Sequence, residues 1–378
     1  MAITPHWFLP TNGDSRTDLS LGNAVGREGS RVNAGSSERA PTVGYIGQIA
    51  RSAEALGFVG ALTPTSSWCE DAWVMTAALS QVTDTFKFLV AFRPGLISPT
   101  LQAHMAATYQ RISRGRLLLN VVTGGDDVEQ RRFGDRLGKA ERYARCAEHL
   151  HVFRELWDGE PLSYRGDYVE VEDAQIIPAE PRPPLYFGGS SAPALDVAAR
   201  YADVYLTWGE PPAAVAAKLD AVRELAARHG RELRYGIRLH VIARDTSEEA
   251  WAEADRLLGG LDPAHIERAQ ATQRASGSEG QRRMSELHQG RTDALEVYPN
   301  LWAGIGLVRG GAGTALVGSH EEVADRMAEY HYLGIEEFVL SGYPHLEEAY
   351  RVGEGVLPAL RRRGLLADAH TQPETVEV

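Results

Sequence analysis

The feature that most constrains the fold is an alternation of short apolar segments with longer segments of helical periodicity. Eight segments read as strands: residues 3–9, 60–64, 87–93, 116–123, 185–188, 204–207, 233–243 and 337–341. Helical patterns lie between them, for example at residues 45–56, 71–82, 101–112, 142–157 and 212–229. This alternation is typical of βα units around a parallel sheet, and eight strands are enough to close a barrel. We predict an α/β fold, with residues 1–378 forming a single (β/α)8 TIM-barrel domain with insertions.

Three stretches do not fit a simple βα unit. Residues 14–41 are rich in Gly, Ser, Asn and Arg and form a long loop after the first strand. Residues 164–177 alternate in polarity around a turn, which predicts an inserted hairpin. Residues 259–318 hold a polar segment and dense glycines, and long segments of this kind are often functional. We predict an insertion over the barrel mouth, with a mobile lid around residues 275–283.

Composition restricts the class of partner and the compartment. A formal charge of -12 at pH 7 argues against general binding of nucleic acid or of an anionic membrane. The two cysteines, Cys69 and Cys146, suit a reducing compartment better than a disulfide framework. We see no signal-peptide pattern and no apolar stretch of membrane-spanning length. We therefore expect a cytoplasmic protein that acts on a small molecule.

Arg238 and His240 interrupt an otherwise apolar predicted strand. Residues two apart on a strand share a face, so both side chains should project inward together. A buried guanidinium is costly unless an anion meets it. Two interpretations are open. Arg238 pairs with a core carboxylate and His240 is a satisfied interior histidine, or the two form an anion site at a strand end, where such barrels place their chemistry.

The run Gly188-Gly189-Ser190-Ser191 is a second candidate anion site, because it follows a predicted strand and precedes a helix. Glycines allow close backbone approach, and helix-start N–H groups with serine hydroxyls suit a phosphate. The alternative is simple capping of the helix by one of the serines. No G-x-G-x-x-G follows a strand in Rossmann context and no Walker pattern occurs, so a doubly wound dinucleotide site is not expected.

Four further residues lie near strand ends or in the insertion. Cys69 precedes a predicted helix start, where the dipole favours a thiolate, or it is a small buried hydrophobe. Arg309 is an exposed arginine or a lid cation that closes over an anion. Tyr343 is placed to donate a hydrogen bond or proton, and Trp208 is core or pocket wall. No metal-ligand motif or nucleophile elbow occurs, so no metal is predicted.

Several runs together resemble the flavin-dependent alkanesulfonate monooxygenases of the bacterial luciferase-like superfamily. The matching runs are residues 7–11, 69–73, 120–124, 184–191, 205–212, 236–242, 299–304, 307–318 and 340–352. The resemblance covers almost the whole chain, and the last three runs are the most specific.

This resemblance implies a two-component system that works on an organosulfonate. A separate NAD(P)H-dependent flavin reductase would supply reduced FMN, which reacts with O2 to a C4a-(hydro)peroxyflavin. The C–S bond of the sulfonate would then be cleaved, releasing sulfite and a carbonyl product. The resemblance also implies a homodimer or homotetramer.

The matching motifs carry family roles over to individual residues. The resemblance implies that Arg238 and Arg309 hold the sulfonate and that His240 orients the substrate or moves a proton. Tyr343 and Cys69 would take part in the chemistry. The implied substrate-binding positions are Asn12, Trp208, Arg238 and Arg309. The implied FMN-binding positions are Tyr143, Gly189, Ser190 and Ser191 at the phosphate, with Asn120 and Thr123 near the isoalloxazine.

The chain departs from the family pattern at the predicted mouth of the barrel. Asn12 stands where relatives read histidine, residues 14–41 are longer, and Ser66-Ser67-Trp68 replaces Gly-Arg-Ser before the cysteine. These changes should alter substrate choice rather than flavin chemistry. A simple alkanesulfonate is favoured by family frequency, and a sulfosugar such as sulfoquinovose is the other candidate, because added polar groups can satisfy hydroxyls. A deazaflavin-dependent oxidoreductase and a non-catalytic flavin-binding protein are the alternative functions.

Overall fold

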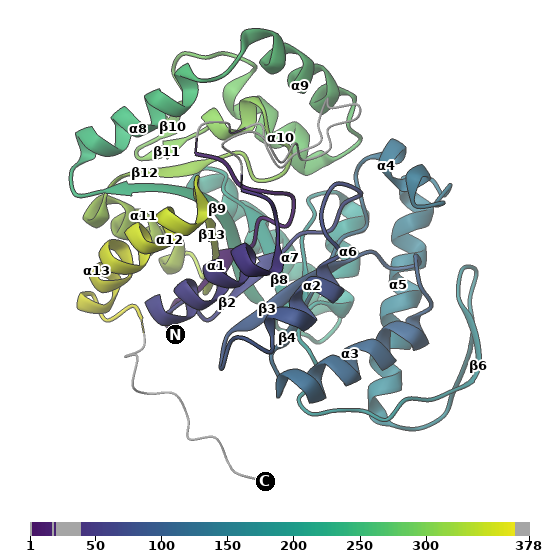
Figure 1. The fold of residues 1–378 in the computed structure, drawn as a ribbon. Helices are drawn as coiled ribbons and strands as arrows, with labels where there is room; N and C mark the ends of the chain where they lie inside the picture. Colours follow the sequence, from purple (N-terminus) through teal and green to yellow (C-terminus); the bar gives the residue numbers. More distant parts are fainter. Residues whose placement is uncertain (1, 17–18, 20–38, 367–378) are drawn as a thin grey trace.

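The computed structural model describes residues 2–16, 19 and 39–366 and has a closed parallel barrel at its centre (Figure 1). Its strands are β1 (Thr4–Phe8), β2 (Gly60–Thr63), β3 (Lys87–Phe92), β4 (Leu117–Val121), β7 (Leu185–Phe187), β8 (Val204–Trp208), β9 (Arg234–Arg244) and β13 (Glu337–Ser341). Each strand pairs with the next, and β9 pairs with both β8 and β13 to close the circle. These are the eight predicted strands, with ends displaced by no more than two residues. The predicted TIM barrel is confirmed.

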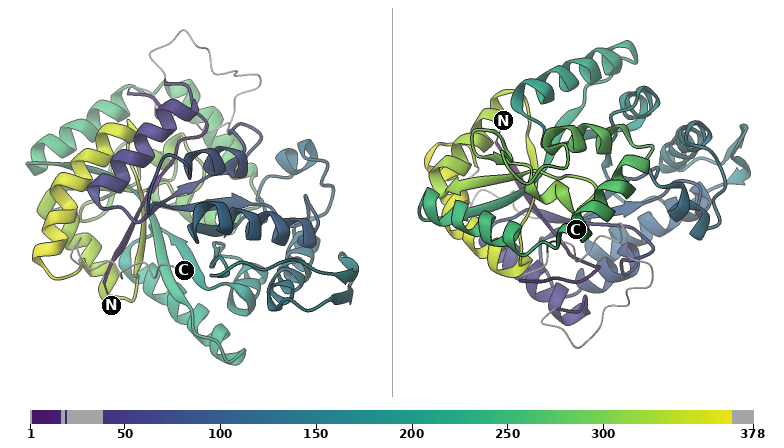
Figure 2. Two further views of the ribbon diagram at one scale, coloured as in Figure 1. Left: turned by 60° about the horizontal axis from the view of Figure 1, so that its bottom comes forward. Right: turned by 90° about the horizontal axis from the view of Figure 1, so that it is seen from above.

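Helices surround the barrel and connect its strands (Figure 2). They are α1 (Val43–Leu56), α2 (Ala72–Leu79), α3 (Pro99–Ser113), α5 (Lys139–Glu155), α6 (Ala192–Tyr201), α7 (Pro212–Arg228), α11 (His320–Tyr332), α12 (His345–Arg351) and α13 (Leu357–Arg362). Local chemistry sets several of their ends: the Thr42 hydroxyl accepts from Tyr45 N at the start of α1, and Ser319 with Glu322 forms a capping box on α11. Within the described ranges, no helix is both long and apolar enough to cross a lipid bilayer.

Three insertions extend the barrel. The short helix α4 (Asp127–Arg132) follows β4, and the predicted hairpin is present as β5 (Leu162–Arg165) and β6 (Glu170–Ala174). The third insertion contains α8 (Ser247–Gly259), α9 (Pro263–Ala275), α10 (Glu279–His288), β10 (Glu296–Tyr298), β11 (Leu301–Trp302), the 3-10 turn η2 (Gly304–Leu307) and β12 (Ala315–Ser319). Figure 1 shows α9 and α10 above the barrel. The mobility of residues 275–283 stays a prediction, and most of the predicted loop 14–41 (17–18 and 20–38) lies outside the described residues.

Strand β9 belongs to the barrel and to the third insertion at once. Its residues 234–238 pair with β8, whereas residues 240–244 pair with β12 of the insertion. Throughout residues 236–240 it also pairs with β13. The predicted site residues Arg238 and His240 therefore lie where the strand exchanges one partner for another.

The barrel interior is layered, because alternate residues of each strand point inward. One buried cluster of such side chains consists of Phe8, Leu62, Leu89, Leu118, Tyr186, Val204, Leu206 and Val339. Strand β9 contributes no apolar side chain to this cluster, and in the register of the sheet Arg238 lies beside Val339. A guanidinium thus stands next to a position at which the neighbouring strand supplies a hydrophobic group.

A polar cluster lies at the end of the barrel where the strands begin. The Glu337 carboxylate accepts hydrogen bonds from His6 Nε2 at 2.9 Å, from the Tyr186 hydroxyl and from Arg234. Glu337, His6 and Tyr186 are at most 2% exposed. Burial favours the protonated acid, but the hydrogen bonds and charges of His6 and Arg234 outweigh it and lower the pKa of Glu337. This cluster closes the barrel on the side away from the cavity described below.

Candidate active site

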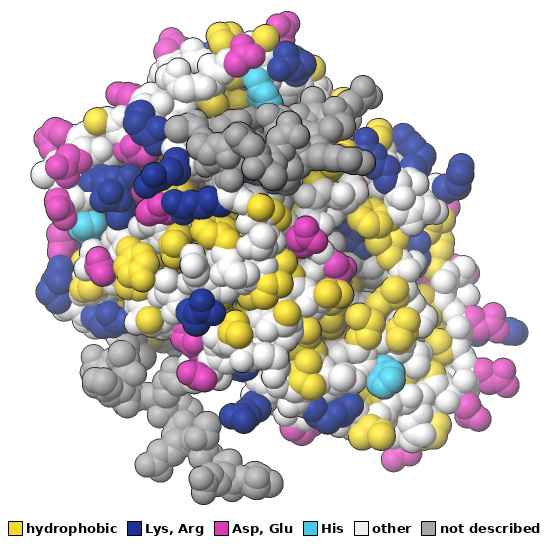
Figure 3. Space-filling model, viewed as in Figure 1, with side chains coloured by type: hydrophobic (Ala, Val, Ile, Leu, Met, Phe, Trp, Pro, Cys, Tyr) yellow, Lys and Arg dark blue, Asp and Glu magenta, His cyan; other side chains and the backbone are white. Residues whose placement is uncertain are grey.

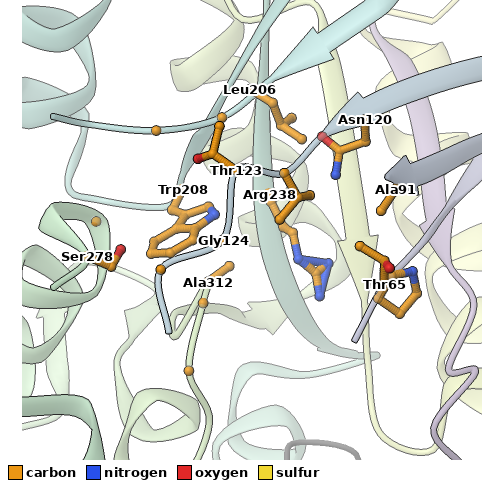
Figure 4. A pocket seen from close by; sticks show the side chains of 18 of the residues that line it. Thr65, Ala91, Asn120, Thr123, Gly124, Leu206, Trp208, Arg238, Ser278 and Ala312 are labelled. Carbon is orange, nitrogen blue, oxygen red and sulfur yellow. The ribbon is translucent and has the colours of Figure 1, made fainter. Parts of the chain in front are cut away.

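A cavity of about 370 Å³ opens at the carboxyl ends of the barrel strands, under the third insertion. Figure 4 shows side chains from β4, β8 and β9 directed into it, together with Ser278 and Ala312 of the insertion. The cavity wall brings together nearly all the predicted site residues: Asn12, Cys69, Asn120, Thr123, Tyr143, Gly189, Ser190, Ser191, Trp208, Arg238, His240 and Arg309. Tyr343 is the exception and lies behind the wall. This is the face on which TIM barrels carry their active sites.

Arg238 presents a cation to the cavity without a carboxylate beside it. Its guanidinium stacks over the Phe8 ring, with 4.2 Å between Cζ and the ring centroid. Its Nη1 is buried, and within the described ranges no side chain forms an ion pair or hydrogen bond with it. Burial lowers the pKa of Arg238 from 12.5 to about 10, which leaves it charged at neutral pH. In the part of the chain that the structure describes, the first interpretation of Arg238, pairing with a core carboxylate, does not hold.

His240 lines the same cavity but is held firmly by the protein. Its Nε2–H donates to the Ala312 carbonyl at 3.0 Å, so its Nδ1 accepts from the Ser341 hydroxyl at 2.8 Å. Burial, and then the positive charges of Arg238 and Arg309, hold the pKa of His240 well below its usual value. His240 is thus a neutral imidazole that ties the insertion to the barrel at the cavity wall.

Stability should fall as the solution is acidified through the normal histidine range. Burial lowers the pKa of His149 to about 3 and of His288 to about 4, and that of His240 is also strongly lowered. In the unfolded chain each of these imidazoles takes up a proton near pH 6.5, whereas in the folded chain it stays neutral. The folded state therefore loses stability relative to the unfolded state as the pH falls below about 6.5. We expect a loss of about 1.4 kcal/mol per histidine by pH 5.5, measured as the free energy of urea-induced unfolding. His149→Gln should reduce this slope, and His104→Gln, on an exposed side chain, should not. The carboxyl of Glu348, whose pKa burial raises to about 7, gains stability over the same pH range and partly offsets the loss. An unchanged slope in His149→Gln would therefore contradict the assignment.

Arg309 lines the cavity and packs against Tyr343 behind the wall. The Arg309 guanidinium lies 5.0 Å from the Tyr343 ring centroid, and its Nη1 donates to the Leu19 carbonyl at 3.3 Å. Tyr343 is 5% exposed and stacks on His240, with 5.4 Å between ring centroids. Its hydroxyl is buried without a partner in the described residues, and burial raises its pKa. The Arg238 guanidinium therefore packs on the ring of Phe8, and the Arg309 guanidinium packs on the ring of Tyr343.

Sequence reasoning did not identify His345 and Asp14, which lie next to the aromatic rings of the site. His345 packs edge-on against Tyr343, with 4.9 Å between ring centroids, and lies tilted against Phe8, with 5.6 Å between ring centroids. The buried Asp14 carboxylate accepts from the backbone N of His345 at 2.8 Å and from its Nδ1 at 2.9 Å. Tyr45 donates a further hydrogen bond to Asp14. Their positions in the sequence could have indicated them, since Asp14 and His345 follow the first and last barrel strands, where such barrels carry their active sites.

The Gly189-Ser190-Ser191 turn has the features of an anion cradle. A Cβ on Gly189 would lie 2.7 Å from the Ala194 side chain, so only glycine lets the turn approach α6 this closely. The Tyr205 hydroxyl donates to the Gly189 carbonyl at 2.7 Å. Ser191 occupies the N-cap of α6 but makes no capping hydrogen bond, and its Oγ is buried without a partner in the described chain. Simple capping by Ser191 is therefore not observed, and its hydroxyl is available to a ligand.

Cys69 and Trp208 complete the wall. Burial raises the pKa of the Cys69 thiol to about 11, against the lowering hydrogen bonds of Thr11 and Ser66. The thiol is protonated at neutral pH, so the thiolate expected from the helix dipole is not favoured. The Trp208 indole packs on the backbone of Gly280, where a Cβ would lie 2.8 Å from the ring. Trp208 is a pocket wall that joins β8 to α10.

The wall also contains residues that sequence reasoning did not select. Thr65 follows β2, Lys139 begins α5, and Ser278 and Glu279 begin α10. None of them belongs to a motif with a recognisable spacing. Their common signal is that they follow a barrel strand or start a helix next to the cavity.

Comparisons with known proteins agree with this geometry. The sequence profile described as luciferase-like monooxygenase matches residues 23–337. A riboflavin lyase solved with modified FMN and riboflavin has a TM-score of 0.80 at 18% identity, covering 99% of this chain and 94% of that one. EDTA monooxygenase from Chelativorans sp. BNC1 has a TM-score of 0.77 at 18% identity, covering 98% and 96%. An F420-dependent secondary alcohol dehydrogenase has a TM-score of 0.66 at 16% identity, covering 95% and 99%.

The two kinds of comparison carry different weight. At these identities the structural likenesses show a shared fold and leave the cofactor and substrate open. The profile match extends over most of the chain and includes the strands that build the cavity. The chain belongs to the luciferase-like monooxygenase family.

Proposed function

We propose that this chain is a flavin-dependent monooxygenase that cleaves the C–S bond of an organosulfonate. One observation carries the proposal: the cavity holds a guanidinium, Arg238, that has no anionic partner in the described residues. A buried cation of this kind is stabilised by a ligand anion. A second candidate anion site at Ser191 lies elsewhere in the same cavity, so a phosphate-bearing cofactor and an anionic substrate can both be bound.

The residues around Ser191 fit the phosphate of FMN. The unpartnered Ser191 hydroxyl, the Ser190 side chain and the first N–H groups of α6 are hydrogen-bond donors of the kind that phosphate accepts. Tyr143 also lines this part of the cavity, and Asn120 and Thr123 of the β4 end are the groups proposed to face the flavin ring. When bound, reduced FMN supplies the two electrons with which O2 is activated.

The chain's own residues then position the sulfonate. Arg238 binds its charge, and Arg309 adds a second positive charge from the insertion. Neutral His240 keeps the insertion in place, and the protonated Cys69 thiol is a hydrogen-bond donor rather than a nucleophile. The overall reaction consumes a sulfonate, O2 and reduced FMN and yields sulfite, a carbonyl compound, water and oxidised FMN. The substrate is an alkanesulfonate or a sulfosugar.

We further propose two protein partners. The first is a separate NAD(P)H-dependent flavin reductase, since the sequence has no dinucleotide-binding fingerprint of its own. The second is another copy of this chain, forming a homodimer or homotetramer. Exposed Val74 on α2 and Leu101 and Ile112 on α3 support this, and Figure 3 shows hydrophobic side chains over this part of the surface.

The reaction is tested by sulfite release. With a generic flavin reductase, NADH, FMN and O2, the chain should release sulfite from at least one member of a panel of alkane-, aryl- and sugar-sulfonates. Omitting FMN or O2 should abolish release, because both enter the overall reaction. Sulfite formed without oxygen would overturn the oxygenase assignment. Tight binding of reduced deazaflavin with no response to FMN would favour the F420-dependent alternative.

A further inference from the structure

One side of the cavity is built from polar side chains at the ends of the first two barrel strands. Asn12 follows β1, and Thr65 and Ser66 follow β2. Figure 4 shows Thr65 and Arg238 directed into the same cavity. We call Asn12, Thr65 and Ser66 the polar wall.

The hydrogen-bonding groups of the polar wall are largely unused by the protein. The Asn12 side chain makes no hydrogen bond within the described ranges, and its Oδ1 is buried. The hydroxyl of Thr65 has no described partner, although its backbone carbonyl accepts from Arg93 at 3.5 Å. The Ser66 Oγ accepts from the backbone N of Trp68 at 3.0 Å, and its hydroxyl also hydrogen-bonds the Cys69 thiol, which leaves one lone pair of Oγ for a ligand. A buried amide oxygen without a hydrogen-bond donor is costly in a folded protein unless a ligand supplies the donor.

The loop that carries Thr65 and Ser66 is held by contacts with the short helix α4. Glu129 of α4 accepts from the backbone N of Ser67 at 3.0 Å and from Arg93 at 2.6 Å. Arg132, also of α4, stacks over Trp68 with 4.5 Å between Cζ and the ring centroid. Thr65 and Ser66 are therefore held in place before any ligand arrives. Such preorganised groups favour ligands that match their geometry.

We propose that the substrate is a polyhydroxylated sulfonate, with Arg238 binding its sulfonate and the polar wall binding its hydroxyl groups. This inference rests on the sulfonate-cleaving function proposed above. An unsubstituted alkyl chain placed against Asn12 would desolvate the amide and give it no hydrogen bond. Hydroxyl groups on the carbons beyond the sulfonate carbon would donate to the amide oxygen and to the serine oxygen, and would accept from the threonine hydroxyl. The polar wall thus determines specificity between two sulfonates of equal charge.

The first experiment compares two six-carbon sulfonates that differ in their hydroxyl groups. We expect kcat/KM for sulfite release from 6-deoxy-6-sulfoglucose to exceed that from hexane-1-sulfonate by roughly 100-fold or more. Sites built to hydrogen-bond a hydroxyl discriminate against analogues that lack it by up to about 10⁴–10⁵-fold. Equal values, or a preference for hexane-1-sulfonate, would overturn the proposal.

Variants of the wall locate this preference in the named residues. Asn12→Ala and Ser66→Ala should each lower the ratio of the two kcat/KM values at least tenfold. Ser67→Ala is the matched control, because Ser67 is exposed, adjoins Ser66 and does not line the cavity. It should leave the ratio unchanged. A ratio that is the same in Asn12→Ala as in the unmodified protein would contradict the assignment of Asn12.

A binding measurement separates failure of this inference from failure of the proposed reaction. Calorimetric titration of the protein without FMN should show 6-deoxy-6-sulfoglucose binding at least tenfold more tightly than hexane-1-sulfonate, with the difference lost in Asn12→Ala. If this pattern holds and no sulfite forms from any sulfonate, the substrate class stands and the reaction is wrong. If sulfite forms but neither binding nor turnover prefers the sugar sulfonate, the reaction stands and the polyol inference is wrong. If neither ligand binds, both are overturned.

Discussion

Replacing Arg238 with alanine is expected to lower kcat/KM for sulfite release by about 30-fold to several thousand-fold. This corresponds to about 2–5 kcal/mol, the usual loss on truncating one partner of a buried charge pair, at about 1.4 kcal/mol per factor of ten. In the proposed reaction this partner is the sulfonate of the substrate. Because no carboxylate in the described residues pairs with Arg238, its removal leaves no protein anion exposed to a low dielectric. The effect should therefore fall on sulfonate binding and turnover and leave the fold intact.

Two further variants make this result specific. Arg238→Lys keeps a charge but loses the planar group that stacks on Phe8, so we expect an intermediate loss. Arg228→Ala changes an exposed arginine on α7 and should leave kcat/KM unchanged. Thermal unfolding of each variant checks the fold. If Arg238→Ala turns over sulfonates as well as the unmodified chain, the guanidinium is structural and the proposed substrate site is wrong.

Replacing Glu337 with glutamine is expected to produce the largest loss of stability, about 3 kcal/mol in the free energy of unfolding. Breaking a buried ion pair by removing one charge typically costs about 3–5 kcal/mol. The lower end applies because the Arg234 side chain is 45% exposed and regains water, whereas His6 and Tyr186 stay buried. The measurement is urea-induced unfolding of the full chain at pH 8, followed by tryptophan fluorescence.

The neighbouring Glu336 provides a matched control for this prediction. In the part of the chain that the structure describes, the Glu336 side chain forms no ion pair, and it is only partly buried, so Glu336→Gln should change stability by less than about 0.5 kcal/mol. The cavity is at the other end of the barrel, so Glu337→Gln should also retain flavin affinity where the protein remains folded. Equal stability of the two variants would show that the amino-terminal cluster does not need the charge of Glu337.

The barrel could be predicted because its strands are short, apolar and regularly separated by helical patterns. The inward direction of Arg238 and His240 could be predicted as well, since it follows from the two-residue period of a strand. Contacts between segments that are distant in sequence could not be predicted. Nothing local relates Asp14 to His345, or Glu129 to the backbone of Ser67, although each contact is short and specific.

The electrostatic states of the site residues were the hardest to foresee. A helix dipole favours a Cys69 thiolate, but burial has the larger effect and keeps the thiol protonated. His240 has two interpretations in the sequence, and the structure combines them, because a fully bonded neutral imidazole also lines the cavity. Such outcomes depend on how much water is excluded around each group, which a linear pattern does not encode.

The exchange of partners along β9 limits how this protein can be remodelled. Residues 240–244 rely on β12 of the insertion for their hydrogen bonds. A truncation that removes the insertion would leave this stretch as a bare sheet edge, open to pairing with other chains and to aggregation. An insertion transplanted from a relative would have to bring a strand in the register of β12. The insertion that covers the cavity and the strand β9, which carries Arg238 and His240, therefore cannot be exchanged independently of each other.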